Sequence, residues 1–131
     1  MARISVEIDI ASEFRYRAPE MPKGGAAIFV SQSGETADTL AALRYAKAQG
    51  QKIIAVVNQP ESSVAREADV VLPTLAGPEI GVASTKAFTT QLAVLACCRV
   101  ALARACGVIS RVPETELVGV MAEIPSRASK V

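Results

Sequence analysis

A strand, a tight polar turn and the start of a helix are predicted by one stretch, AAIFVSQSGETADTLAAL at Ala26–Leu43. The run Ala26–Val30 is apolar and contains Ile and Val, which is typical of a buried strand. Leu40 and Leu43 then recur at helical spacing. The six residues between these segments, SQSGET at Ser31–Thr36, therefore form the turn that joins the strand to the helix.

The composition of this turn suits a phosphate group. The first turn of a helix leaves backbone N–H groups without intrahelical partners, and the helix dipole places partial positive charge there. Gly34 permits a close approach of the backbone. Ser31, Ser33 and Thr36 add small hydroxyl donors. Because the turn has no Lys or Arg, dipoles and hydroxyl groups would hold the anion.

An ordinary capped helix is the alternative interpretation of the same residues. Ser33 or Thr36 could act as the N-cap, and Glu35 and Asp38 are common first-turn acids. These two carboxylates oppose an anion unless they point away from the turn. The pattern alone does not separate the two interpretations, because short motifs have many false matches.

Composition indicates one globular domain at most. The chain has 131 residues, of which 50% are hydrophobic, and a net charge of +1. This balance indicates neither nucleic-acid binding nor membrane-surface binding. The longest uncharged run of the most apolar helix, Ala87–Cys98, is shorter than the roughly 20 residues of a membrane span. The apolar residues near Met1 alternate with charges, so we expect no signal peptide and a cytoplasmic location.

Cysteine and histidine usage argues against a metal site. Cys97, Cys98 and Cys106 fall in an apolar helical pattern, and the chain contains no His. A zinc site would need ligands at a tighter, loop-borne spacing. We therefore expect buried free thiols and no metal or other cofactor. The absence of His also removes the commonest general base.

Alternating strands and helices predict a parallel α/β sheet. The helix after the turn ends near Gly50, which fits the position after a helix C-terminus. Strands are expected at Lys52–Asn58 and Asp69–Leu72, with a short helix at Ser62–Ala68 between them. In such sheets ligands bind beyond the carboxyl ends of the strands, so the loops after successive strands would share one edge with the turn.

The segments before and after this predicted sheet indicate one more strand and three more helices. Ile4–Ile10 alternates apolar and polar residues, as a half-exposed strand does, and Ala11–Arg17 could form a short helix. A long helix should run from about Thr85 to Ala105 and is apolar nearly all round, so we expect it to be buried against a second domain or subunit. A last helix should start at Pro113 and end at Pro125.

Three separated motifs carry a resemblance to a known family. SQSGETADTL at Ser31–Leu40 resembles the phosphate loop of the sugar isomerase (SIS) domains. More narrowly, EFRYR at Glu13–Arg17 and EIGVASTKAFTTQ at Glu79–Gln91 are similar to the first SIS domain of the glutamine–fructose-6-phosphate aminotransferases. The resemblance covers nearly the whole chain from Val6 onward.

The resemblance implies a fold, a pathway and a set of site residues. The fold would be a doubly wound parallel sheet with helices on both faces, in flavodoxin-like order and without the family's first strand. The pathway would be hexosamine biosynthesis, in which glucosamine 6-phosphate is made from fructose 6-phosphate and glutamine. The residues implied for the sugar phosphate are Ser31, Gln32, Ser33 and Thr36. Val82 and Ser84 are implied for the sugar, although Ser84 could equally cap the long helix.

The same resemblance leaves the chemistry unassigned. The isomerase's glutamate, histidine and lysine have no match here, so we expect fructose 6-phosphate or a related phosphosugar to bind without turnover by this chain alone. We expect one incomplete domain over residues 1–131, with the sheet and helices in 1–112 and a helical linker toward a second SIS domain in 113–131. A non-catalytic phosphosugar sensor, an FMN-binding domain and a structural fragment without a ligand stay open as alternatives.

The pairing of the strands predicted at Ile4–Ile10 and Ala26–Val30 bears on whether the chain forms oligomers. By the resemblance, Ile4–Ile10 and Ala26–Val30 are the second and third strands, and the strand between them has no counterpart. Either these two segments pair directly or another chain fills the gap, because unpaired edges expose backbone groups. We therefore expect a homo-oligomer.

Overall fold

The computed structural model describes residues 4–78, 85–109 and 111–128. The chain divides into two compact units, one within residues 7–91 and the other within residues 1–6 and 92–131. The elements of the described part are, in order, α1 (Ala11–Arg17), β1 (Ala26–Ser31), α2 (Ala37–Ala48), β2 (Lys52–Val57), α3 (Ser63–Glu67), β3 (Val70–Pro73), α4 (Thr85–Ala105) and α5 (Arg111–Ala128).

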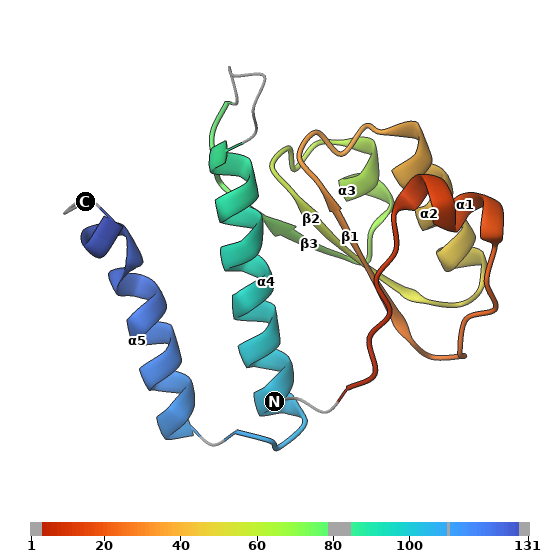
Figure 1. The fold of residues 1–131 in the computed structure, drawn as a ribbon. Coiled ribbons are helices and arrows are strands. Elements are labelled where there is room, and N and C mark those ends of the chain that lie inside the picture. Colours follow the sequence, from red (N-terminus) through yellow and green to blue (C-terminus); the bar gives the residue numbers. More distant parts are fainter. Residues whose placement is uncertain (1–3, 79–84, 110, 129–131) are drawn as a thin grey trace. The chain divides into compact units, whose positions relative to one another are not determined.

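The described strands form a parallel sheet in the order β1, β2, β3 (Figure 1). β1 pairs with β2 from Ala26 opposite Lys52 to Ser31 opposite Val57, and β2 continues the register to Pro73 of β3. Helices flank this sheet, which confirms the predicted α/β class and the predicted succession of these three strands.

One face of the sheet carries the hydrophobic core of the unit within residues 7–91. β2 alternates its buried side chains toward this face, and α2 and α3 supply the opposing ones. The members of this core cluster are Leu43, Ala46, Ile53, Ala55, Val57, Val64 and Ala65, each at most 5% exposed. Burying such aliphatic side chains is the main stabilising contribution in a unit of this size.

β1 is an edge strand of the described sheet and is less buried than its sequence predicts. Ala27 and Phe29 pack against the core, whereas Ile28 and Val30 on the opposite face are 42% and 40% exposed. A continuous apolar run predicts burial on both faces. The observed alternation instead shows that only one face of β1 is covered among the described residues.

The predicted strand over Ile4–Ile10 is wrong. These residues have no regular secondary structure and do not pair with β1, and Ile8 is 94% exposed. A strand is stable only when a neighbour accepts its backbone hydrogen bonds, so alternation without a partner is not sufficient. Local contacts occur instead: the Ile10 N–H donates to the Asp9 carboxylate, which also pairs with Arg17 of α1. The alternative of a second chain filling the gap, and the homo-oligomer, stay predictions.

α4 agrees with the sequence at both ends, whereas α5 begins two residues before its predicted start at Pro113 and ends after its predicted end. α4 begins at Thr85 and ends at Ala105 as expected, whereas α5 begins at Arg111 and continues to Ala128. The predicted end at Pro125 is therefore wrong. A proline removes one backbone donor and crowds the preceding turn, but its fixed φ of about −65° is compatible with a helix, so the residues after it can stay helical. Between the two helices, Arg104 forms an ion pair with Glu114 at 2.9 Å.

The apolar surface of α4 lies largely uncovered by other described residues. Phe88 is 59% exposed and Leu92 is 50% exposed. By length and composition alone, the segment Lys86–Ala105, with a mean hydropathy of 1.3, is long and apolar enough to cross a membrane. The expectation that the chain has no membrane span, and the expectation that a second domain or subunit covers α4, both stay predictions.

Cys97 and Cys98 of α4, and Cys106 directly after it, are free thiols as predicted, but two of the three are not buried. Cys97 and Cys106 are exposed and Cys98 is half-buried. Burial, and then the neighbouring Cys97, raise the pKa of Cys98. The predicted burial of Cys97 and Cys106 is wrong because none of the described residues packs over them. Among the described residues there is no cluster of three or more metal-ligating side chains.

Candidate functional site

The carboxyl ends of the three described strands meet at one edge of the sheet, as predicted. Ser31 ends β1, Asn58 follows β2, and Thr74 follows β3. Asn58 is 8% exposed and joins the loops at this edge. Its backbone N–H donates to the Gln32 carbonyl at 3.2 Å, and its carboxamide oxygen accepts from the Thr74 hydroxyl at 3.1 Å. The edge of the sheet is therefore a connected group of loops built around Asn58.

The carboxamide of Asn58 also fixes the loop after β3. Its oxygen accepts a second hydrogen bond from the Ala76 N–H at 2.9 Å, and its NH2 group donates to the Gly77 carbonyl at 2.8 Å. No sequence motif marks Asn58 as a functional residue. The available signal was an amide side chain directly after a predicted buried strand.

The turn between β1 and α2 closes on its own hydroxyl groups. The Gly34 N–H donates to Ser31 Oγ at 3.0 Å, and the Glu35 N–H donates to Ser33 Oγ at 3.3 Å. Gly34 has a φ of +65°, a conformation that favours glycine. Since each of these hydroxyl oxygens accepts from the backbone, its hydrogen stays free to donate to a ligand.

The start of α2 lacks the side-chain cap of an ordinary helix. Thr36 occupies the N-cap position and makes no side-chain capping hydrogen bond. The first backbone bond of the helix runs from the Leu40 N–H to the Thr36 carbonyl, so the N–H groups of Ala37, Asp38 and Thr39 precede the intrahelical ladder. The alternative drawn from the sequence is an ordinary helix capped by Ser33 or Thr36, and capping by Thr36 is not observed. The helix start keeps N–H donors for an anion.

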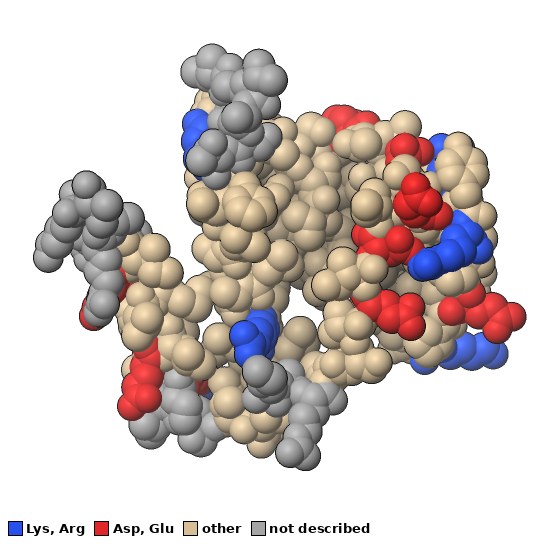
Figure 2. Space-filling view, in the orientation of Figure 1, with Lys and Arg blue, Asp and Glu red and all other residues tan. Residues whose placement is uncertain are grey.

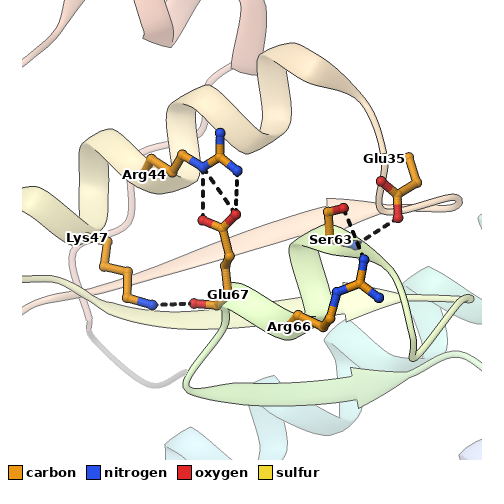
Figure 3. A network of polar contacts seen from close by, with 6 residues as sticks. All are labelled: Glu35, Arg44, Lys47, Ser63, Arg66 and Glu67. Atoms are coloured by element: carbon orange, nitrogen blue, oxygen red, sulfur yellow. Dashed lines mark hydrogen bonds and ion pairs between the residues drawn. The ribbon is translucent and has the colours of Figure 1, made fainter.

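The two acidic residues of the turn are engaged with partners on other elements. The Glu35 carboxylate accepts from the Ser63 N–H at 2.7 Å, and Figure 3 shows its side chain directed to the start of α3. The Ser63 side chain, and then the Ser63 N–H, lower the pKa of Glu35. Asp38 forms an ion pair with Arg15 of α1 at 3.0 Å. These contacts therefore weaken the repulsion that the two carboxylates would exert on an anion at the turn.

Basic and acidic side chains are mixed on the surface around α1 (Figure 2). α1 packs on α2 through an edge-to-face contact between Phe14 and Tyr45, whose ring centres are 5.8 Å apart. The Tyr45 hydroxyl donates to the carbonyls of Ala18 and Pro19. This packing places Arg15 beside the start of α2, where it neutralises Asp38.

An open hollow of about 350 Å³ borders the same helix start. Its walls come from three segments of the unit within residues 7–91, namely residues 9–12, the end of β1 and the first turns of α2. Thr36 and Thr39 line it, together with Val30, Asp9 and Asp38. The hollow gives a small molecule access to the start of α2 from one side.

The predicted site residues differ in how far the structure can place them. Ser31 is buried, Gln32 is half-buried, and Ser33 and Thr36 are exposed, all within one turn. The residues predicted to line the sugar, Val82 and Ser84, lie outside the described residues. The structure therefore brings the four phosphate residues together and leaves the assignment of their ligand a prediction.

A family model for the SIS domain matches residues 1–101 of the chain. The chain belongs to the SIS domain family. The predicted resemblance is thereby confirmed at the level of the family.

Individual relatives narrow this resemblance. The chain is 64% identical over 124 residues to the glutamine–fructose-6-phosphate aminotransferase (isomerizing) of Bradyrhizobium diazoefficiens, a match over 95% of this chain and 20% of that protein. It is 60% identical over 131 residues to the enzyme of the same name from Brucella abortus, a match over 100% of this chain and 22% of that protein. The chain thus spans about a fifth of the length of these curated relatives.

A solved structure supports the same comparison. The C-terminal domain of glucosamine-fructose-6-phosphate aminotransferase from Francisella tularensis superposes with a TM-score of 0.85 at 42% identity. The match covers 92% of this chain and 36% of that one. The chain therefore has the fold of a solved structure of the aminotransferase family.

Proposed function

We propose that this SIS chain binds the phosphate group of fructose 6-phosphate, or of a related phosphosugar, at the turn Ser31–Thr36. In this proposal it is the sugar-phosphate-binding part of the isomerase domain of a glutamine–fructose-6-phosphate aminotransferase, in hexosamine biosynthesis. The observation that carries the proposal is the start of α2, which Thr36 leaves without a side-chain cap and which hydroxyl groups surround.

The turn offers two kinds of donor to a phosphate. The N–H groups at the start of α2 point out of the helix and carry the positive end of its dipole. The exposed hydroxyls of Ser33 and Thr36 can donate directly. Ser31 is buried and already binds the Gly34 N–H, so its main contribution is to hold the shape of the turn.

The proposal assigns binding and no turnover to this chain by itself. Interconversion of a ketose and an aldose moves a proton between adjacent carbons, which needs a positioned base. The chain has no His, and the carboxylate within the turn, that of Glu35, accepts a hydrogen bond from the Ser63 N–H. A cytoplasmic location and assembly with further copies belong to the same proposal.

Calorimetric titration with fructose 6-phosphate tests the proposal. The double variant Ser33→Ala/Thr36→Ala should bind more weakly by about 1–3 kcal/mol, since each hydroxyl bonds a charged group. Ser5→Ala is the matched control, because it removes an exposed hydroxyl outside the turn and should leave the affinity unchanged. Equal affinities of the double variant and the wild type would contradict the proposed site.

A further inference from the structure

The turn Ser31–Thr36 is attached to the start of α3 by three contacts. The Val64 N–H donates to the Gly34 carbonyl at 3.0 Å. The Ser63 N–H donates to the Glu35 carboxylate at 2.7 Å. The backbone of Gly34 also lies against Ser62, since a Cβ on that glycine would be 2.1 Å from the Ser62 hydroxyl oxygen. Of the three, only the bond to Glu35 depends on a side chain of the turn.

The other end of α3 is fixed independently. Arg44 of α2 donates to both carboxylate oxygens of Glu67, with Nε 3.0 Å from one of them, and Lys47 donates to the Glu67 carbonyl at 2.6 Å. Figure 3 shows these contacts at one end of α3 and the Glu35–Ser63 contact at the other. α3 is thus a fixed support to which the turn is attached.

We propose that Glu35 is a positioning residue for phosphate binding: its carboxylate, held by the Ser63 N–H, orders the turn in its binding conformation. This inference rests on the proposed function of the turn. A ligand held by backbone N–H groups and hydroxyls requires all of them to be aligned at once, and ordering a loose turn upon binding lowers the affinity. The Glu35–Ser63 hydrogen bond supplies that order before the ligand arrives.

The ordering role of Glu35 and a purely electrostatic role predict opposite effects of its removal on the affinity for a phosphate. If Glu35 acted only as a nearby negative charge, its removal would strengthen the binding of a phosphate. If it orders the turn, removal weakens binding although the side chain does not touch the ligand. Because the hydrogen bond needs an acceptor and not a charge, a neutral amide can replace the carboxylate.

Four variants separate these effects. Glu35→Ala removes the acceptor and Glu35→Gln keeps one. Ser63→Pro removes the N–H donor, and proline is favoured at the first position of a helix. The preceding Ser62 has φ −69° and ψ 162°, a conformation that the residue before a proline prefers. Ser63→Ala is the control for the lost hydroxyl, since it keeps the N–H.

The experiment is calorimetry with fructose 6-phosphate, combined with unfolding curves of each variant. Glu35→Ala and Ser63→Pro should each weaken binding about three- to tenfold, with little change in the unfolding midpoint, because the bond is exposed. Glu35→Gln should bind nearly as the wild type does. Ser63→Ala removes the side-chain interaction with Glu35 but keeps the N–H, so it should weaken binding less than Ser63→Pro does. The double variant Glu35→Ala/Ser63→Pro should be no weaker than either single one, because both remove the same hydrogen bond.

Failure of this inference is distinct from failure of the proposed function. If the wild type binds, Ser33→Ala/Thr36→Ala weakens binding, and Glu35→Ala binds as tightly as the wild type or more tightly, the positioning role is overturned while the site stands. If Ser33→Ala/Thr36→Ala has no effect, the phosphate site itself is refuted. A loss in Glu35→Ala that Glu35→Gln does not restore would also overturn the positioning role.

Discussion

Gly34 lies so close to Ser62 that a Cβ on the glycine would be 2.1 Å from the Ser62 hydroxyl oxygen and 2.5 Å from Ser62 Cβ. Ser62 is 4% exposed, and its hydroxyl caps α3 by accepting from the Ala65 N–H at 3.4 Å. The two residues belong to loops that follow different strands. Their contact therefore joins the candidate phosphate turn to the cap of the next helix.

Gly34→Ala should be strongly destabilising. The alanine would have to adopt a φ of +65° and displace the buried Ser62 hydroxyl. The left-handed conformation costs about 1–2 kcal/mol and overpacking costs about 1–3 kcal/mol more. We expect the free energy of unfolding to fall by about 2–4 kcal/mol in urea titrations followed by circular dichroism.

Gly50→Ala is the matched control for this variant. Gly50 has a φ of +78°, and a Cβ there would meet nothing within 4 Å. It should lose only about 1–2 kcal/mol, the cost of the left-handed conformation. If both variants lost the same stability, the close packing of Gly34 on Ser62 would be disproved.

Asn58→Ala should destabilise the edge of the sheet where the site lies. Truncation leaves the Thr74 hydroxyl, the Ala76 N–H and the Gly77 carbonyl without their present partner. We expect a loss of about 1–3 kcal/mol in the free energy of unfolding, since the Thr74 hydroxyl is buried and the bonds to Ala76 and Gly77 are partly buried. The exposed neighbour Gln59 gives the control, and Gln59→Ala should change stability by less than about 0.5 kcal/mol. A similar result for both variants would contradict the role of Asn58.

Stability should fall in acid because the carboxylates of Glu35, Glu67 and Asp69 have lowered pKa values. The hydrogen bond from Arg44 lowers the pKa of Glu67, and the Ile53 N–H lowers the pKa of Asp69. The unfolded chain therefore binds more protons than the folded one at acid pH. The stabilisation is complete above roughly pH 5 and is lost progressively as the pH falls through about 4 and below.

Unfolding midpoints measured from pH 7 to pH 3 check this dependence. Asp69→Asn should show a shallower decline than the wild type, because it removes one of the three carboxylates with a lowered pKa. Glu20→Gln changes an exposed carboxylate outside these contacts and should decline as the wild type does. A wild-type midpoint that does not fall in acid would refute the assignment of these pKa shifts.

The chain alone should not interconvert fructose 6-phosphate and glucose 6-phosphate. The physical reason is that the chain has no His, and in the described part of the chain the Glu35 carboxylate of the turn is engaged by the Ser63 N–H. A coupled spectrophotometric assay with purified protein measures this directly. Turnover that disappears in Ser33→Ala would contradict the expectation, whereas turnover that persists would point to a contaminating enzyme.

Local patterns predicted most of the described sheet and its edge. The apolar runs of β1, β2 and β3 and the glycine after α2 are short-range signals, and each element ends within about two residues of its expected end. The meeting of the loops at Ser31, Asn58 and Pro73 at one edge followed from parallel topology alone. The family resemblance added the assignment of the phosphate residues, which no periodicity contains.

The failures have a common physical cause, which is dependence on contacts distant in the sequence. The alternation of Ile4–Ile10 predicts a strand only if a neighbour pairs with it, and in the described structure none does. The burial of Cys97 and of Ile28 likewise depends on a covering surface that a local pattern cannot supply. Glu35 was predicted as a first-turn acid, whereas its partner Ser63 lies 28 residues further along the chain.

The central claim, that a sugar phosphate binds at the start of α2, is tested most directly by amide NMR during titration with fructose 6-phosphate. The account predicts saturable shifts that are largest for the N–H groups from Gln32 to Thr39 and absent from the α5 amides. An equimolar titration with unphosphorylated fructose should produce no such shifts. Saturable shifts elsewhere in the chain, with Gln32 to Thr39 unchanged, would contradict the account.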